Sequence, residues 1–249
     1  MANIPKSWAD VTHKQYYNLI CTPTLSFVPL AEQLRDVLLW VSDFTEEEIY
    51  ALDLVRLAEI ANQITWIFEP MQPSAAREFT HENIEYSYAS FFNKPLIKLI
   101  LNQTQKYDSE QIANEVAAND FSSIPKILAL WATEKGEQGF DMGKVSAREK
   151  AFETAGVNIL AGFYNFYVSQ LVKIRENFKE LFKDTYLKGS ENFKHILDRY
   201  GWEISVSDLA NADITKYDGV RLTPIFDALT QLEIRKLTAI AHENIDRQR

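Results

Sequence analysis

Apolar residues recur at helical spacing along most of this chain. Residues 28–43 show the pattern clearly, because apolar residues three or four positions apart lie on one face of a helix. This stripe consists of Leu30, Leu34, Val37, Leu38 and Val41. Residues 12–21 form a shorter predicted helix that begins at Thr12. The pattern predicts a mainly α-helical protein, a multi-helix globular bundle.

Two helix starts are marked by capping residues. Thr45 is followed three positions later by Glu48, which is the spacing of a capping box with reciprocal hydrogen bonds between side chains and backbone. Asp53 is the expected N-cap of the next helix, whose stripe is Leu54, Leu57, Ile60, Ile64 and Ile67. That helix should end before Pro70, because proline disfavours helical geometry in the preceding residue.

The helical pattern resumes near Pro95 and continues to the end of the chain. Pro125 lies in the first turn of one predicted helix, Ser146 begins another, and Gly201 is expected to end a third. Thr223-Pro224 opens the last helix. Its apolar stripe is Ile225, Leu229, Leu232, Leu237 and Ile240.

One stretch has the period of a β-strand instead. Between residues 77 and 88, apolar and polar residues alternate around a turn-like His81-Glu82-Asn83. This predicts one small β-hairpin. Because an isolated hairpin is only marginally stable, it should lie against helices.

An aromatic-rich helix occupies residues 161–182. Its continuous apolar stripe is formed by Leu160, Phe163, Tyr167, Leu171, Ile174, Phe178 and Leu181. We expect this stripe to be core, packed against the helix at 123–133 and the C-terminal helix. Phe166 lies about 100° from the centre of the stripe. It is therefore covered by a loop or, with the neighbouring Tyr164, belongs to an interface with another chain.

The length of 249 residues suits one large domain or two small ones. The loops at 68–76 and 135–144 are the candidate boundaries. The first would separate an N-terminal helical region, 1–70, from a hairpin and C-terminal helical region, 71–249. One compact domain is an equally good interpretation.

Charge and cysteine content exclude several classes of function. The chain has 35 acidic and 26 basic residues, a net charge of −9, so direct nucleic-acid binding is not expected. The beginning does not look like a signal peptide, and no run of about 18 apolar residues predicts a membrane span. The single cysteine, Cys21, excludes an internal disulfide and fits a reducing compartment. We expect a cytoplasmic protein.

The motifs for catalysis and ligand binding do not match. Gly139 to Gly143-Lys144 is one residue short of a phosphate-binding loop, and Val145 stands where that loop needs a hydroxyl. The four histidines are not spaced as pairs that could share a metal on one helix face. No serine or cysteine nucleophile signature is present. We therefore predict no catalytic residue, no cofactor and no metal site.

Five motifs occur in a familiar order over roughly residues 3 to 175. They are "NIPKSWADVTHKQYYNL", "DFTEEEIYALDLVRLAEIANQITWIFEP", "REFTHENIEYSY", "SSIPKILALWATEKG" and "VNILAGFYNFYVSQL". Together they resemble morphogenesis proteins of tailed bacteriophages that infect Bacteroidetes, some of which are described as tail assembly chaperones. Such a chaperone coats the tape-measure protein and shields its apolar helical surface until the tail tube forms.

The resemblance implies a non-enzymatic phage morphogenesis protein that binds another virion protein. A tail assembly chaperone for the tape-measure protein, in the host bacterial cytoplasm, is the first interpretation. Trp8, Tyr164 and Phe166 are the predicted contact residues. Pairing with a second copy is also compatible with an amphipathic helical chain, and no membrane partner is expected.

Two alternatives remain open at the level of the sequence. The protein could instead be a permanent virion component, such as a connector or tail-completion protein. It could also be a small phage enzyme or host-directed factor with a pocket lined by His81, Tyr86 and Tyr88.

Overall fold

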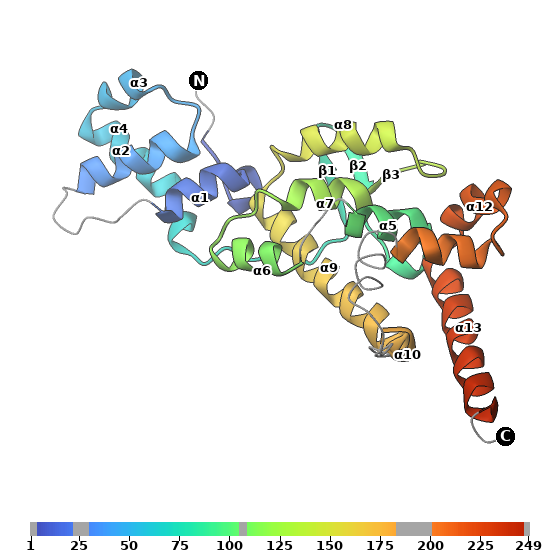
Figure 1. Cartoon of the computed structure of the whole chain (residues 1–249). Helices are drawn as coiled ribbons and strands as arrows, with labels where there is room; N and C mark the ends of the chain where they lie inside the picture. Colours follow the sequence, from blue (N-terminus) through green and yellow to red (C-terminus); the bar gives the residue numbers. More distant parts are fainter. Residues whose placement is uncertain (1–3, 22–29, 105–108, 183–200, 247–249) are drawn as a thin grey trace. The chain divides into compact units, whose positions relative to one another are not determined.

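The computed structural model describes residues 4–21, 30–104, 109–182 and 201–246. The fold is mainly helical, with one small antiparallel sheet, as the sequence predicts (Figure 1). The chain divides into two compact units. Unit 1 consists of Met1–Tyr88 and Tyr107–Phe166, and unit 2 consists of Ala89–Lys106 and Tyr167–Arg249. The predicted boundary at residue 70 stays a prediction, because contacts in the folded chain do not report whether a segment folds alone.

Most of the named elements belong to unit 1. They are η1 Trp8–Asp10, α1 His13–Cys21, α2 Leu30–Val41, α3 Glu46–Tyr50, α4 Leu54–Gln63, η2 Thr65–Phe68, β1 Glu78–His81, β2 Ile84–Ser87, α6 Ser109–Ala117, α7 Ile124–Trp131, β3 Thr133–Glu134 and α8 Met142–Phe152. Helix α9, Val157–Asn177, begins in unit 1 and ends in unit 2. Unit 2 also contains η3 Phe91–Asn93, α5 Leu96–Thr104, α10 Lys179–Phe182, η4 Ile214–Lys216, α12 Tyr217–Leu222 and α13 Ile225–Asp246.

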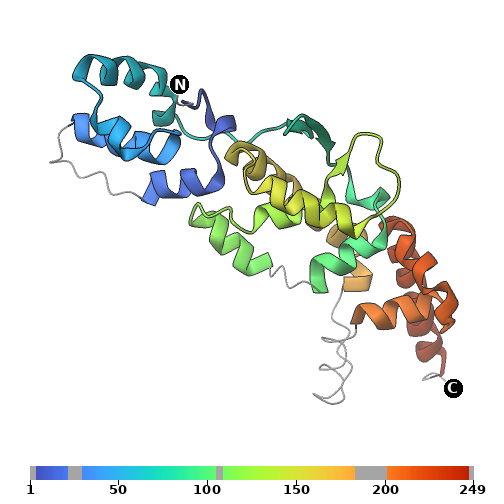
Figure 2. The same ribbon diagram turned by 90° about the horizontal axis from the view of Figure 1, so that it is seen from above.

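Helices α2, α3 and α4 form a small module within unit 1, and α2 lies beside α4 in both ribbon views (Figure 1, Figure 2). Its core consists of Leu38, Ile49, Leu57, Ile60 and Ile64. Each fully buried Leu or Ile side chain stabilises the fold by about 1.5–3 kcal/mol. Both predicted caps are confirmed. Thr45 and Glu48 form the capping box, and Asp53 accepts a hydrogen bond from the backbone N–H of Arg56 at 2.8 Å.

Helix α4 is shorter than its apolar pattern predicts. It ends at Gln63, and the 3₁₀-helix η2 follows in place of another α-helical turn. This tighter turn carries the Trp66 ring to an edge-to-face contact with Trp8, with ring centroids 5.1 Å apart. The tertiary contact of a large aromatic side chain therefore takes precedence over the helical period of the sequence.

The predicted hairpin is present, and it forms a three-stranded sheet of order β1-β2-β3 with a strand that the sequence did not reveal. Phe79 pairs with Tyr86, which in turn pairs with Glu134. His81 is the last residue of β1 rather than part of the turn. The turn is Glu82-Asn83, and both residues have positive φ, as a two-residue hairpin loop of this hand requires.

The sheet packs against α8, which confirms the expectation that the hairpin lies against a helix. The ring of Phe152 lies 4.8 Å from that of Tyr86 and 5.6 Å from that of Phe79. Helix α8 begins at Met142, where Asp141 accepts a hydrogen bond from the N–H of Gly143 at 2.8 Å. The predicted start at Ser146 is therefore wrong by one turn, because Asp141 acts as the N-cap.

A buried ion pair joins α8 to the loop that precedes it. The guanidinium of Arg148 donates to the Glu137 carboxylate at 2.8 Å, and both side chains are 2% exposed. Arg148 also donates from Nε to the Ala129 carbonyl, and Glu137 accepts from the backbone N–H of Glu134. Burial opposes ionisation of Glu137, but the hydrogen bonds from Glu134 and Arg148 outweigh it, and the pKa of Glu137 is lowered.

Two glycines of unit 1 let backbone segments approach closely. A Cβ on Gly156 would lie 2.2 Å from the Ala9 carbonyl oxygen, and one on Gly162 would lie 2.0 Å from the Ser74 carbonyl oxygen. Hydrogen bonds accompany these approaches, from the N–H of Val157 to the Val11 carbonyl and from the N–H of Ser74 to the Asn158 carbonyl. The start of α9 therefore supports two segments that are distant in sequence.

The stripe of α9 is largely core, as predicted: Leu160, Phe163, Tyr167, Ile174 and Phe178 are buried. In unit 2, the ring of Phe178 contacts that of Phe226 on α13 at 5.7 Å. This confirms the expected packing against the C-terminal helix.

The last helix begins after Thr223-Pro224 as predicted, because α13 starts at Ile225. The expectation that Gly201 ends a helix is wrong. Residues 201–209 are helical, and a side chain at Gly201 would meet open space. The predicted start of that helix at Ser190 lies outside the described residues.

Candidate functional site

The sheet carries a depression of about 340 Å³ on its polar side. It is lined by Glu78, Phe79, Thr80, Glu85, Tyr86, Ser87 and Lys135. Lys135 forms an ion pair with Glu85, and this hydrogen bond raises the pKa of the exposed lysine. A lysine that is more firmly protonated is a poorer base and nucleophile. Lys135 is therefore not activated for catalysis by this contact.

The other two residues expected in an enzyme pocket lie elsewhere. The Tyr88 hydroxyl donates to the Ala76 carbonyl at 2.7 Å, and burial raises the pKa of this tyrosine. His81 Nε2 lies 2.8 Å from the Ala151 carbonyl oxygen and 3.3 Å from the Thr154 hydroxyl. Neither side chain lines the depression that contains Tyr86, so the three residues do not converge on one ligand.

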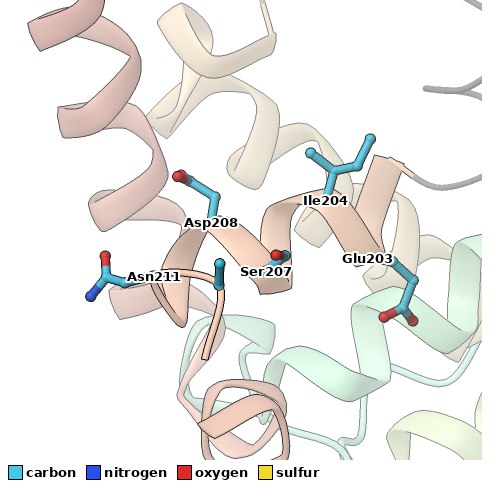
Figure 3. A pocket seen from close by; sticks show the side chains of 6 residues that line it. Glu203, Ile204, Ser207, Asp208 and Asn211 are labelled. Atoms are coloured by element: carbon cyan, nitrogen blue, oxygen red, sulfur yellow. The ribbon is translucent and has the colours of Figure 1, made fainter. Parts of the chain in front are cut away.

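A second depression, of about 550 Å³, lies in unit 2 (Figure 3). It is lined by Glu203, Ile204, Ser207, Asp208, Asn211 and Ala212. Figure 3 shows that the carboxylates of Glu203 and Asp208 point to different sides of one helix. Each is already paired with an arginine: Arg221 with Glu203 at 3.0 Å and Arg235 with Asp208 at 3.2 Å. These acids have structural partners and do not form a convergent site.

Among the described residues, no group of three or more His, Cys, Asp or Glu side chains could hold a metal ion. Within the same ranges, no helix is both long enough and apolar enough to cross a bilayer. The surface features that stand out are exposed apolar side chains, which on a protein surface mark contact sites when they gather in one place.

One such feature runs along the second half of α13. We call it the α13 stripe, and it consists of Ile234, Leu237, Ile240 and Ile245. Ile234 and Ile245 are each 51% exposed and Leu237 is 45% exposed. At about 100° per residue these side chains lie on one side of the helix. The stripe therefore offers exposed apolar side chains to a helical partner.

Polar contacts from neighbouring elements hold α13 at residues 233–236. Lys236 donates to the Leu181 carbonyl at 3.0 Å, and Glu233 accepts from the N–H of Leu181 at 3.3 Å. Arg235 forms its ion pair with Asp208. These three residues fix the rotation of α13 about its own axis, so its exposed apolar side chains keep a defined direction.

A second apolar feature lies where α3 meets α4. We call it the α3–α4 corner, and it consists of Tyr50, Leu54 and Val55, which are 56%, 69% and 71% exposed. The guanidinium of Arg35 lies 5.6 Å from the centre of the Tyr50 ring and holds it by a cation–π contact. Leu54 belongs to the apolar stripe that the sequence predicts for this helix, but unlike Leu57, Ile60 and Ile64 it is exposed.

The residues predicted as contacts are partly engaged within unit 1. Trp8 is half-buried, packs edge-to-face on Tyr16 and Trp66, and donates from Nε1 to the Glu69 carbonyl at 3.1 Å. Tyr164 is half-buried. Phe166 is only 9% exposed. Their role in binding a partner stays a prediction.

Phe166 is covered by the segment around the hairpin. Its ring centre lies 5.0 Å from that of Tyr88, and the guanidinium of Arg77 lies over the ring, 4.9 Å from its centre. Of the two accounts given by the sequence, coverage by chain outside the helix describes this position. Little of the ring is left for contact with another protein.

Comparison with known proteins gives no match to a protein-family model, to a curated protein or to a solved structure. The function is therefore inferred from the surface features above and from the order of sequence motifs.

Proposed function

We propose that this chain is a non-enzymatic phage morphogenesis protein that binds another virion protein, and that it acts as a tail assembly chaperone for the tape-measure protein. The observation that carries the proposal is the α13 stripe. An apolar helical face suits a partner whose own apolar helical surface needs cover. The ordered sequence motifs supply the phage context.

The chemistry of the stripe supports binding rather than catalysis. Its side chains are aliphatic and contribute binding free energy through apolar area removed from water. Such binding requires no rearrangement of α13, because contacts of Glu233, Arg235 and Lys236 already orient the helix. The surface is therefore preformed, and little conformational entropy is lost in ordering it when a partner binds.

Co-expression with the tape-measure protein of the same phage tests the proposal. The expected result is a soluble complex of the two proteins that co-elutes in size-exclusion chromatography. Replacing Ile234→Asp together with Leu237→Asp should weaken the complex by about tenfold or more, because two charges would be buried against an apolar partner.

Ala239→Asp is the matched control. Ala239 is exposed on the same helix but lies about 180° from the middle of the stripe, so the charge it adds faces away from the partner. This variant should bind as the unaltered chain does. Failure to bind the tape-measure protein or any other tail protein would refute the proposal, provided that circular dichroism shows a folded chain.

A further inference from the structure

We infer that the α3–α4 corner is a second and separate binding surface, and that it takes a basic amphipathic helix, with apolar side chains flanked by Lys and Arg. This surface lies in unit 1, whereas the α13 stripe lies in unit 2. The inference does not rest on the tape-measure protein being the partner. It rests on the exposure of three large apolar side chains, on the charge around them and on the rigidity of their support.

A small rotation of α4 about its axis cannot bury Val55. Leu57 and Ile60 lie on the core side of the helix and are buried, while Val55 lies about 140–160° away from them. Turning Val55 inward would turn this core outward. The helix is fixed by the larger apolar area, so Val55 stays exposed on the free protein, and Leu54 in the first turn is 69% exposed as well.

The segment that carries the corner is acidic. Residues 43–55 contain Asp43, Glu46, Glu47, Glu48 and Asp53 and no Lys, Arg or His. Glu46, Glu47 and Asp53 are exposed. Charges within about 8 Å of one another interact before physiological salt screens them, so a partner with Lys and Arg beside its apolar side chains is attracted.

The nearest basic groups are already engaged with this module. Arg35 covers the Tyr50 ring and donates to the Leu52 carbonyl at 3.4 Å. Arg56 forms an ion pair with Glu59 at 2.6 Å. The acidic side chains of residues 43–55 therefore give the surface around the corner a net negative charge. The same charge repels an anionic membrane surface.

The support of the corner is rigid. The capping box at Thr45 and the N-cap at Asp53 fix the starts of α3 and α4 on either side of Tyr50. Ile49 and Leu57 anchor both helices in the module's core. A partner therefore meets a surface that needs no ordering before it binds.

Isothermal titration of the full chain with synthetic peptides tests the inference. The probe is a helical peptide of Leu and Lys with Leu along one face, and the comparison peptides replace Lys by Glu or scramble the order. We expect binding of the amphipathic Lys peptide alone, and we expect added salt to weaken it. Glu46→Gln with Glu47→Gln should weaken this binding about threefold.

The double variant Leu54→Asp, Val55→Asp distinguishes docking on the apolar side chains from attraction by charge alone. This variant is more acidic than the unaltered chain, so attraction by charge alone would strengthen binding. Docking on an apolar surface predicts the opposite, a loss of about tenfold or more. Ile214→Asp with Leu222→Asp is the control, because it also adds two charges, at side chains that are 76% and 58% exposed in unit 2.

Three outcomes would overturn the inference. They are equal or tighter binding by the Leu54→Asp, Val55→Asp variant, equal binding of the scrambled peptide, and self-association of the unaltered chain that this variant abolishes. The last would assign the corner to a second copy of the chain. The Ile234→Asp, Leu237→Asp variant should bind the Lys peptide normally, so failure of the tape-measure proposal would leave this result unchanged.

Discussion

At the scale of single residues, Gly162 shows how one missing side chain shapes unit 1. The Ser74 carbonyl oxygen occupies the space where a Cβ would be, 2.0 Å from its ideal position. Because the obstructing atom belongs to the backbone, it cannot move aside as the end of a long side chain can. The segment around residue 74 therefore rests on α9 only while residue 162 is glycine.

Gly162→Ala should lower the free energy of unfolding by about 1–3 kcal/mol, because overpacking displaces the backbone. The intrinsic preference of alanine for a helix, about 1 kcal/mol, offsets part of this loss. Urea denaturation followed by circular dichroism measures the change.

Gly219→Ala is the matched control, since this glycine lies in α12 and an added Cβ would meet no atom within 4 Å. It should leave stability unchanged or raise it by up to about 1 kcal/mol. Equal effects of the two substitutions would contradict the close approach at Ser74.

At the scale of elements, the Arg148–Glu137 pair determines how the loop at 135–144 is held. Removing one partner of a buried pair leaves the other charge poorly compensated, and the Glu134 carboxylate, 3.8 Å from Arg148 and partly exposed, replaces little of the lost contact. Glu137→Gln should therefore lower the free energy of unfolding at pH 7 by about 3 kcal/mol. Arg148→Met combined with Glu137→Gln should lose less than the sum of the two single substitutions, because no lone charge remains.

The same pair predicts a dependence on pH. The pKa of Glu137 is lower in the folded chain than its ordinary value of 4.5, so its contribution to stability is present above that value. The contribution is lost as the pH falls through the lowered pKa. The difference in stability between the unaltered chain and Glu137→Gln should shrink in acid. A difference that is constant from neutral to acidic pH would contradict this.

Elements with local signals were predictable from the sequence, and elements set by distant contacts were not. The capping box at Thr45 and the hairpin between 77 and 88 depend on neighbouring residues, and both are present. Strand β3 is only Thr133–Glu134, and it exists because β2 offers it a partner. Two residues carry no period from which a strand could be recognised.

The candidate surfaces show the same limit. The sequence placed Ile225, Leu229, Leu237 and Ile240 in one stripe of α13, but the first two are buried and the last two are exposed. Helical periodicity finds the apolar side of a helix, whereas tertiary contacts decide how far along its length that side is covered. For the same reason the exposure of Leu54 could not be read from its spacing.

At the scale of the whole molecule, a chaperone and a permanent virion component differ in whether the protein is present in the finished particle. A chaperone leaves when the tail is complete, so quantitative mass spectrometry of density-banded virions should not find this protein while infected cells contain it abundantly. Several copies per purified particle would contradict the chaperone role and favour a connector or tail-completion protein.

The division of unit 1 into two stretches of sequence has a consequence for synthesis on the ribosome. The α2–α4 module makes local contacts and can form early, while residues 89–106, which belong to unit 2, emerge before unit 1 is complete. Val11 and Ser74 must wait for their hydrogen-bond partners on Val157 and Asn158. Translation has to pass the start of α9 before the earliest-made part of the chain can settle into its final contacts.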